Sequence, residues 1–262
     1  MEQFTWKDFV HLHGHSEYSI LDSTGYIKSI VAKAKELGMK ALALTDHGNM
    51  YGALKFYREC KKAGIKPILG CEVYTTNNAF NASQKEKTKD NHHLILLAEN
   101  EQGYKNLVKI VSEGTRDVYN KRPRVHKETL RTYHEGIICL SACFAGELPR
   151  AIREKDEQKV RRVIEEHIDI FGKDNYFLEI QRHGIDDEDK GAYTLKRLAK
   201  EYGLEVVATN DFHYVNKEDW IAQDILYCIQ YAAKYKSEER LKLPTPEFYL
   251  KSAEEMNVIF QD

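Results

Sequence analysis

The stretch HLHGHSEYSILD, residues 11–22, places three histidines and one aspartate within twelve positions. Imidazole nitrogens and carboxylate oxygens are the usual protein ligands of zinc and related divalent metals. Histidines two residues apart point to the same face of a strand, so His13 and His15 suit a shared ion. One such pair is weak evidence, and a metal site is predicted only if the same chemistry recurs along the chain.

It does recur, beside several other apolar segments. The further candidates are Asp46 and His47 after ALALT, Glu72 in KPILGCEVY, Cys143 after GIICLS, and Asp211 and His213 after EVVAT. Taken singly, each aspartate could be a helix cap and the cysteine a small buried residue. Recurrence of one ligand chemistry at five or six strand ends favours a common metal site instead.

The elements that position these residues alternate regularly. Strands are predicted at FVHLH, ALALT, KPILGCEVY, HLILLA, GIICLS, YFLEI and EVVAT. Helical periodicity predicts helices over 26–37, 51–63, 102–113, 159–171 and 193–202, and a polar stretch over 75–91 interrupts the pattern. Alternating strands and helices predict a parallel sheet, either closed into a barrel or open and doubly wound.

The positions of the candidate ligands favour the barrel, because chemistry in such barrels lies at the carboxyl ends of the strands. His92 and His93 break this rule, since they precede their strand.

The composition is that of an ordinary globular domain. Its net charge of −2 gives no overall attraction to nucleic acid, so any DNA contact has to be local. Five scattered cysteines, no long apolar run and no signal-like N-terminus predict reduced thiols, no membrane span and a cytoplasmic location.

Six segments resemble a known family. HLHGHSEYSILD, LALTDHGNMYGALKFY, GIKPILGCEVY, HHLILLAENEQGYKNL, ICLSACFAGELP and VVATNDFHY are similar to the polymerase and histidinol phosphatase (PHP) domain, in the version at the N-terminus of the bacterial DNA polymerase III alpha subunit. The likeness covers nearly the whole chain in order, through LPTPEFYLKSAEEM near its end.

The resemblance implies one PHP domain over residues 1–262. Its distorted (β/α)7 barrel is expected over about 5–215, with its metal site at the carboxyl ends of the strands, and a C-terminal helical extension over about 216–262. It also implies two to three divalent ions (zinc, manganese or iron). The ligands carried over by position are His13, His15, Asp22, His47, Glu72, His93, Cys143, Asp211 and His213. His11 is expected to be a neighbour of this set, and His93 is preferred to His92.

The activity implied is hydrolysis of phosphodiesters by a metal-bridged hydroxide, as in a 3′ to 5′ exonuclease that proofreads DNA. Glu72, Asp211 and His213 would act through that hydroxide, with Asp46 orienting a ligand imidazole from outside the ligand set. Two alternatives stay open: a structural metal-binding module that stabilises the polymerase, and a stand-alone or engineered small-molecule phosphoesterase. The expected partners are a DNA 3′ end and the rest of the alpha subunit, because this chain is too short to encode a polymerase.

Substrate contacts are predicted at Arg182 and His183, which could hold a phosphate. Phe212, bulkier than the aliphatic residue usual there, could narrow the site or stack on a base. Arg122 and Arg124 form a small basic loop that is expected to be solvated surface rather than a DNA contact.

Overall fold

The structure is a computed structural model that describes residues 8–78, 90–119 and 121–261. The strands in these ranges are β1 Ala41–Leu44, β2 Lys66–Thr76, β3 His92–Ala98, β4 Val118–Tyr119, β5 Arg122–His126, β6 Ile137–Leu140, β7 Tyr176–Gln181 and β8 Val206–Thr209. The α-helices are α1 Ile27–Glu36, α2 Ala53–Ala63, α3 Glu101–Gly114, α4 Lys127–Thr132, α5 Glu147–Glu154, α6 Glu157–Phe171, α7 Asp186–Tyr202, α8 Trp220–Gln230 and α9 Ala253–Ile259. Most of the polar stretch expected over 75–91 lies outside the described residues, and its start belongs to β2.

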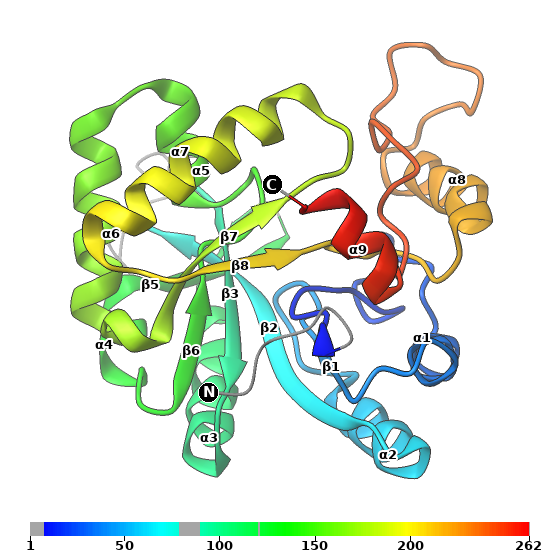
Figure 1. The fold of residues 1–262 in the computed structure, drawn as a ribbon, viewed down its shortest axis with the longest axis horizontal. Coiled ribbons are helices and arrows are strands. Elements are labelled where there is room, and N and C mark those ends of the chain that lie inside the picture. The colour runs from blue at the N-terminus through cyan, green and yellow to red at the C-terminus, as the bar shows by residue number, and fades with distance from the viewer. Residues whose placement is uncertain (1–7, 79–89, 120, 262) are drawn as a thin grey trace.

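The strands form one eight-stranded sheet in the order β4-β5-β2-β3-β6-β7-β8, with β1 paired to β2. The long strand β2 binds β1 along its first half and β5 along its second half (Figure 1). The prediction of seven parallel strands was therefore wrong in number and direction, and the described strands do not show a closed barrel. The short strands β4 and β5 were missed because RPRVH carries a proline and two arginines, which weaken a strand pattern.

Strand β3 runs antiparallel to both of its neighbours, β2 and β6. Its first residues therefore lie at the sheet edge where the other strands end. The register pairs His93 with Tyr74 and Ile95 with Glu72. His93, which lies at the start of β3 rather than before it, thus reaches the same edge as the residues that follow the other strands, and this explains the apparent exception.

The segment expected as the first strand, FVHLH, is not a regular strand. It lies between β1 and the residues after β8: the Ala43 amide donates to the His11 carbonyl (2.9 Å), and the His15 amide donates to the Phe212 carbonyl (2.8 Å). The Thr45 hydroxyl bonds both the amide and the carbonyl of Gly14. A side chain thus replaces part of the backbone ladder that a regular strand requires.

The helices cover the sheet with apolar faces at helical spacing. Helix α1 buries Ile27, Ile30, Val31 and Ala34 and lies beside α2, whereas α5, α6 and α7 gather on another side of the sheet (Figure 1). Helix α7 begins at Asp186 rather than near Tyr193, because four acidic residues in its first turn favour a helix N-terminus. No helix among the described residues is long and apolar enough to cross a membrane.

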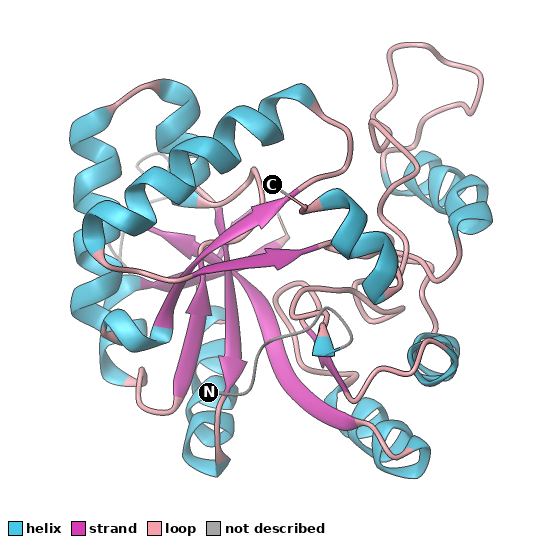
Figure 2. Cartoon of the chain, in the orientation of Figure 1, coloured by secondary structure: helices cyan, strands magenta, loops and turns pink. Residues whose placement is uncertain are grey.

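The C-terminal part contains α8 and α9, joined by a long loop (Figure 2). It returns to the sheet, because the Leu250 amide donates to the Tyr214 carbonyl (3.1 Å) and Leu250 packs in one apolar cluster with Phe212 and Val215. The residues after β8 that carry site candidates are therefore held by the C-terminal segment as well as by the sheet.

Candidate metal centre

Left-handed backbone turns precede or carry several candidate ligands. Leu21 (φ 63°) precedes Asp22, Ala142 (φ 64°) precedes Cys143, and Asp211 itself has φ 44°. Such conformations cost about 1–3 kcal/mol in a non-glycine residue and concentrate at functional sites. The loops therefore bend sharply where each candidate side chain has to turn into the centre.

Glu72, at the end of the part of β2 that pairs with β1, lies at the middle of the cluster. Its Oε2 atom is 3.2 Å from His13 Nε2, 3.0 Å from His15 Nε2 and 3.2 Å from His47 Nδ1. Its Oε1 atom is 2.5 Å from His93 Nδ1. One carboxylate from β2 thus contacts imidazoles from three separate chain segments.

Asp211 approaches the same two histidines of the HxH pair from the loop after β8. Its Oδ1 atom is 3.0 Å from His13 Nε2 and 3.1 Å from His15 Nε2. The Nε2 atoms of His13 and His15 are themselves 3.3 Å apart. Four donor residues therefore converge on one point, and all four side chains are buried.

Asp22 and Cys143 complete the surroundings. Asp22 Oδ2 is 2.8 Å from His47 Nε2 and 3.2 Å from His213 Nε2. Cys143 Sγ is 3.7 Å from His93 Nδ1. The structure thus brings together all nine residues carried over from the PHP pattern. Three groups among them have ligand atoms within 4.8 Å of one another: His13–His15–Glu72–Asp211, His15–His47–His213 and His47–Glu72–His93.

This arrangement fits divalent cations. Zinc with nitrogen ligands at 2.0–2.1 Å holds neighbouring donors about 3.4 Å apart in a tetrahedral shell, close to the N···O and N···N separations of the cluster. Asp211 Oδ1 and His47 Nδ1 are buried and have no hydrogen-bond partner of good geometry among the described residues. Buried polar atoms without partners are costly, and a shared cation would satisfy both.

The electrostatics agree with this assignment. Burial alone would lower the pKa of His15, but the adjacent carboxylates of Asp211 and Glu72 raise that pKa to about 10. Burial opposes ionisation of Glu72, but the charges of His93, His47 and His13 hold its pKa well below the usual range. The carboxylates are thus ionised and attract positive charge, which protons or metal ions can supply.

Asp46 supports the centre through hydroxyl groups. It accepts hydrogen bonds from the Ser16 amide (2.7 Å), the Ser16 hydroxyl (2.8 Å) and the Ser19 hydroxyl (2.8 Å). Ser19 Oγ in turn lies 3.0 Å from His15 Nδ1. Asp46 thus reaches the imidazole through Ser19 and orients it without entering the cluster.

Glu179 on β7 was missed by sequence reasoning. It is 2% exposed, and its Oε1 atom is 2.7 Å from His13 Nδ1. Gln181 and Thr209 donate to the same oxygen, at 2.9 Å and 2.5 Å. The position of Glu179 inside the apolar strand YFLEI could have identified it from the sequence. A carboxylate buried there needs polar partners, which predicts a polar contact at that point.

His11 and His92 lie outside the cluster, as the sequence indicated. His11 Nε2 contacts the Lys251 carbonyl (2.8 Å), and burial lowers the pKa of this histidine to about 4. His92 is buried at the start of β3, and the Thr75 hydroxyl donates to its carbonyl. Both histidines therefore have packing roles in the structure.

Arg182 and His183, predicted to hold a phosphate, both bind groups of the protein itself. Arg182 donates to the Ile259 carbonyl (2.8 Å) and thus holds α9. His183 is fully buried, and its two ring nitrogens contact Glu188 and the Asn210 carbonyl.

Phe212 does not present its ring to a substrate. Its side chain is 0% exposed and packs edge-on against His11, with ring centroids 5.5 Å apart. The ring also fills the space beside Gly14. The prediction of a base-stacking surface was wrong, because the segment carrying His13 covers this ring.

The prediction of a solvated basic loop was wrong for Arg124 and right for Arg122. Arg124 is fully buried on β5 and pairs with Asp117 at 2.9 Å. Arg122 is exposed, and its guanidinium lies 5.1 Å from the centre of the Tyr74 ring. Residues two apart share one face of a strand, so the difference comes from position along β5, whose first residue is exposed and whose last three, from Arg124 on, are buried.

Comparisons with known proteins agree with this geometry. Residues 11–183 match the PHP domain family. The chain is 48% identical over 255 residues to the DNA polymerase III subunit alpha of Borreliella burgdorferi, and 46% identical over 253 residues to that of Treponema pallidum. These alignments cover 97% and 96% of this chain but 22% of each relative, so the chain spans about a fifth of the length of the curated relatives it matches.

Two solved structures share the fold. A protein from Bifidobacterium adolescentis assigned as a metal-dependent phosphoesterase has a TM-score of 0.51 at 15% identity, covering 78% of this chain and 87% of that one. An amidohydrolase from Chromobacterium violaceum, with bound sulfate and no metal, has a TM-score of 0.51 at 15% identity, covering 83% and 96%. The family match covers more than half of the chain and the curated relatives align along nearly all of it, so the chain belongs to the PHP domain family, matching the N-terminal PHP domain of the DNA polymerase III alpha subunit.

Proposed function

We propose that this chain is a metal-dependent phosphoesterase that hydrolyses phosphodiesters, with the 3′ end of a DNA strand as its substrate. The observation that carries the proposal is that nine metal-competent side chains gather at the sheet edge in one cluster, which contains three groups that share residues. Relatives named as DNA polymerase subunits favour a nucleic-acid phosphodiester over a small phosphomonoester.

The ligand set suits two to three divalent ions. Imidazoles and the Cys143 thiol favour zinc or iron, whereas the carboxylates of Asp22, Glu72 and Asp211 also suit manganese. When bound, such ions polarise a phosphoryl oxygen and supply a nucleophile from water at neutral pH. Cys143 is not prepared by the protein to act as a free nucleophile, because burial and the charges of Glu72 and Asp211 raise the pKa of its thiol well above the usual value.

The remaining work falls to residues that hold these ligands in place. Ser19 and Asp46 orient His15, and Glu179 occupies Nδ1 of His13 so that Nε2 faces the centre. Five of the nine ligand candidates are buried and the other four are partly exposed, and burial strengthens the electrostatic interactions of the inner groups. A preorganised, partly buried site of this kind is suited to stabilising the charge that develops during phosphate transfer.

The test combines metal analysis with hydrolysis of bis(4-nitrophenyl) phosphate before chelation, after chelation and after metal return. We expect two to three metal equivalents, loss of turnover on chelation and recovery with manganese or zinc. Asp211→Asn should lose at least one metal and most of the activity, while the exposed control Asp174→Asn keeps both. Full metal content without turnover of any diester would favour the structural-module alternative.

The DNA substrate is tested separately, with a single strand labelled at either end. Shortening from the 3′ end only would support the exonuclease assignment, and attack on neither end would contradict it. Binding of the strand should weaken steeply with salt if phosphate contacts dominate, with a slope of about −0.7 per contact.

A further inference from the structure

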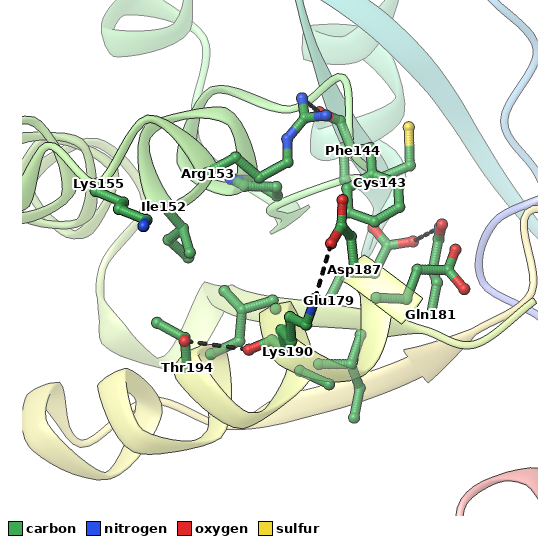
Figure 3. A pocket seen from close by; sticks show the side chains of 17 residues that line it. Cys143, Phe144, Ile152, Arg153, Lys155, Glu179, Gln181, Asp187, Lys190 and Thr194 are labelled. Carbon is green, nitrogen blue, oxygen red and sulfur yellow. Dashed lines mark hydrogen bonds and ion pairs between the residues drawn. The ribbon is translucent and has the colours of Figure 1, made fainter. Parts of the chain in front are cut away.

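A pocket of about 530 Å³ lies between α5 and α7, beside the metal centre (Figure 3). Its volume is within the range of small-molecule sites. Figure 3 shows Cys143 and Gln181 at one end and Lys155 and Thr194 at the other. Because Cys143 belongs to the candidate ligand set and also lines this pocket, the pocket opens next to the point where a phosphate would bind.

The end nearest the metal centre contains an unsatisfied carboxylate oxygen. Glu179 lines the pocket and is 2% exposed. Its Oε1 atom is bonded to His13, Gln181 and Thr209, whereas its Oε2 atom is buried without a partner among the described residues. A carboxylate only accepts hydrogen bonds, so the missing partner is a donor such as a hydroxyl or an N–H group.

The walls of the pocket are apolar and suit a ring. They are formed by Phe144, Pro149, Ile152, Ile180 and Leu195, from α5 and the loop before it, β7 and α7. The guanidinium of Arg153 lies 5.1 Å from the centre of the Phe144 ring. It also donates to the Phe144 carbonyl at 2.8 Å, which holds the lip of the pocket in one position.

The rim on the α5 side is cationic. Arg153 and Lys155 are exposed, and in the described ranges neither has a carboxylate at ion-pair distance. On the opposite side Lys190 already pairs with Asp187 at 3.4 Å. An anion at this pocket is therefore attracted to the α5 rim, where a guanidinium and an ammonium group are available.

We infer that the α5–α7 pocket binds the nucleoside next to the scissile phosphate, with the following phosphate of the strand on Arg153 and Lys155. The order of features from the metal centre outward is an acceptor for a hydroxyl or amino group, an apolar slot, and two cations. A nucleotide unit within a DNA strand presents the matching groups: an N–H donor on its base, a flat ring, and a further phosphate; both of its sugar oxygens are esterified, so the donor belongs to the base. The position of the scissile phosphate rests on the proposed function. The substrates expected are strands of two or more nucleotides.

Gly191 allows the pocket to be filled without harm to the fold. It lines the pocket on α7, and a Cβ added there meets no atom within 4 Å. Glycine is also a poorer helix former than phenylalanine, so the substitution does not weaken α7 through helix propensity. Gly191→Phe should therefore fold and obstruct the pocket. Lys200→Phe places the same ring on an exposed position of the same helix, outside the pocket, as the matched control.

The first experiment measures binding without turnover. Anisotropy of fluorescein-labelled trithymidylate is followed against the whole chain in the presence of chelator. We expect Gly191→Phe to weaken binding by about tenfold or more and Lys200→Phe to leave it unchanged. Wild-type affinity in Gly191→Phe, or no binding by the wild type, would overturn the inference.

The cationic rim is tested with Arg153→Gln combined with Lys155→Asn; asparagine tolerates the left-handed backbone at position 155 (φ 56°). Loss of two phosphate contacts should weaken trithymidylate binding. It should also reduce the slope of log affinity against log salt by about 1.4. An unchanged slope would remove these two residues from the site.

The second experiment separates the pocket from the catalytic proposal. It compares the 4-nitrophenyl ester of thymidine 3′-phosphate with bis(4-nitrophenyl) phosphate, which has no nucleoside. Gly191→Phe should raise KM for the nucleoside ester alone. If the wild type hydrolyses neither ester while Gly191→Phe still weakens trithymidylate binding, the proposed function fails and the pocket assignment stands. Equal effects on both esters would contradict the pocket assignment.

Discussion

At the scale of single residues, the candidate centre depends on side chains that never touch a metal. His15 is oriented by Ser19, and Ser19 is held by Asp46. His13 is oriented by Glu179. A ligand imidazole usually bonds a carboxylate or hydroxyl through its other nitrogen, which sets the tautomer and the direction of the ring.

Ser19→Ala tests this support. The variant removes the hydroxyl that joins His15 Nδ1 to Asp46, so the ring loses its fixed direction. We expect metal affinity to fall by about 10–100-fold with the fold retained. Titration against a competing chelator measures the change, and Ser29→Ala on the exposed side of α1 is the control. Equal affinities in the two variants would show that Ser19 does not orient the ligand.

At the scale of elements, the segment with His13 and His15 is positioned by packing as well as by backbone bonds. Gly14 lies against the Phe212 ring, and a Cβ built on Gly14 would fall 2.0 Å from that ring. Glycine is thus required where this segment crosses the chain after β8. The same contact ties the HxH pair to the loop that carries Asp211.

Gly14→Ala should therefore lower both the free energy of unfolding and the metal content. The added methyl group has to displace a ring that has no free space around it, and overpacking of this kind costs about 1–3 kcal/mol. Phe212→Leu in the Gly14→Ala background should recover part of the loss, because it removes ring atoms near the methyl group. Chemical denaturation of the two single variants and the double variant measures the coupling. Additive effects would mean that the two residues do not clash.

At the scale of the whole molecule, charged groups gather in the interior at the metal centre and also between helices. In the second place Lys127 on α4 and Glu147 on α5 form a buried pair, with Lys127 Nζ 2.7 Å from Glu147 and 3.3 Å from Glu166 on α6. Both places concentrate charge in the interior, so both make stability depend on solution conditions.

Metal removal should lower the melting temperature. Five histidines and three carboxylates from distant segments meet at the centre, and binding to the folded state alone stabilises it by mass action. Scanning calorimetry with and without chelator checks this result, with Asp211→Asn expected to show a smaller difference than the wild type. The same melting temperature in both conditions would contradict a metal-filled centre.

The buried pair predicts a dependence of stability on pH. Burial opposes ionisation of Glu147, but the charge of Lys127 and its hydrogen bond lower the pKa of Glu147 from 4.5 to about 2. A folded-state pKa below the unfolded value stabilises the fold above pH 4.5, and this contribution disappears as the pH falls towards 2. The shift corresponds to a free energy on the order of 3 kcal/mol.

Glu147→Gln should therefore unfold more easily than the wild type at pH 7, and the difference should shrink as the pH falls from about 5 to about 2. Urea denaturation across this range measures both proteins, with the exposed Glu238→Gln as control. A difference that stays constant with pH would show that the pair does not stabilise the fold through ionisation.

The sequence by itself determined the ligand chemistry, the family and most of the helices and strands. These follow from local information: residue types, spacing after apolar segments, and periodicities of two and 3.6 residues. Helix α1 and strand β1 lie where the pattern placed them. The nine ligand candidates could be named without knowing where they lie in space, because each occupies a recognisable short motif.

Only the tertiary structure decided which polar residues meet. The direction of β3 depends on pairing with β2 and β6, and this direction brings His93 to Glu72. The burial of Arg124 and Phe212, and the approach of Glu179 to His13, likewise depend on segments far away in the chain. Long-range pairing and packing free energies set these contacts, and local spacing carries no information about them.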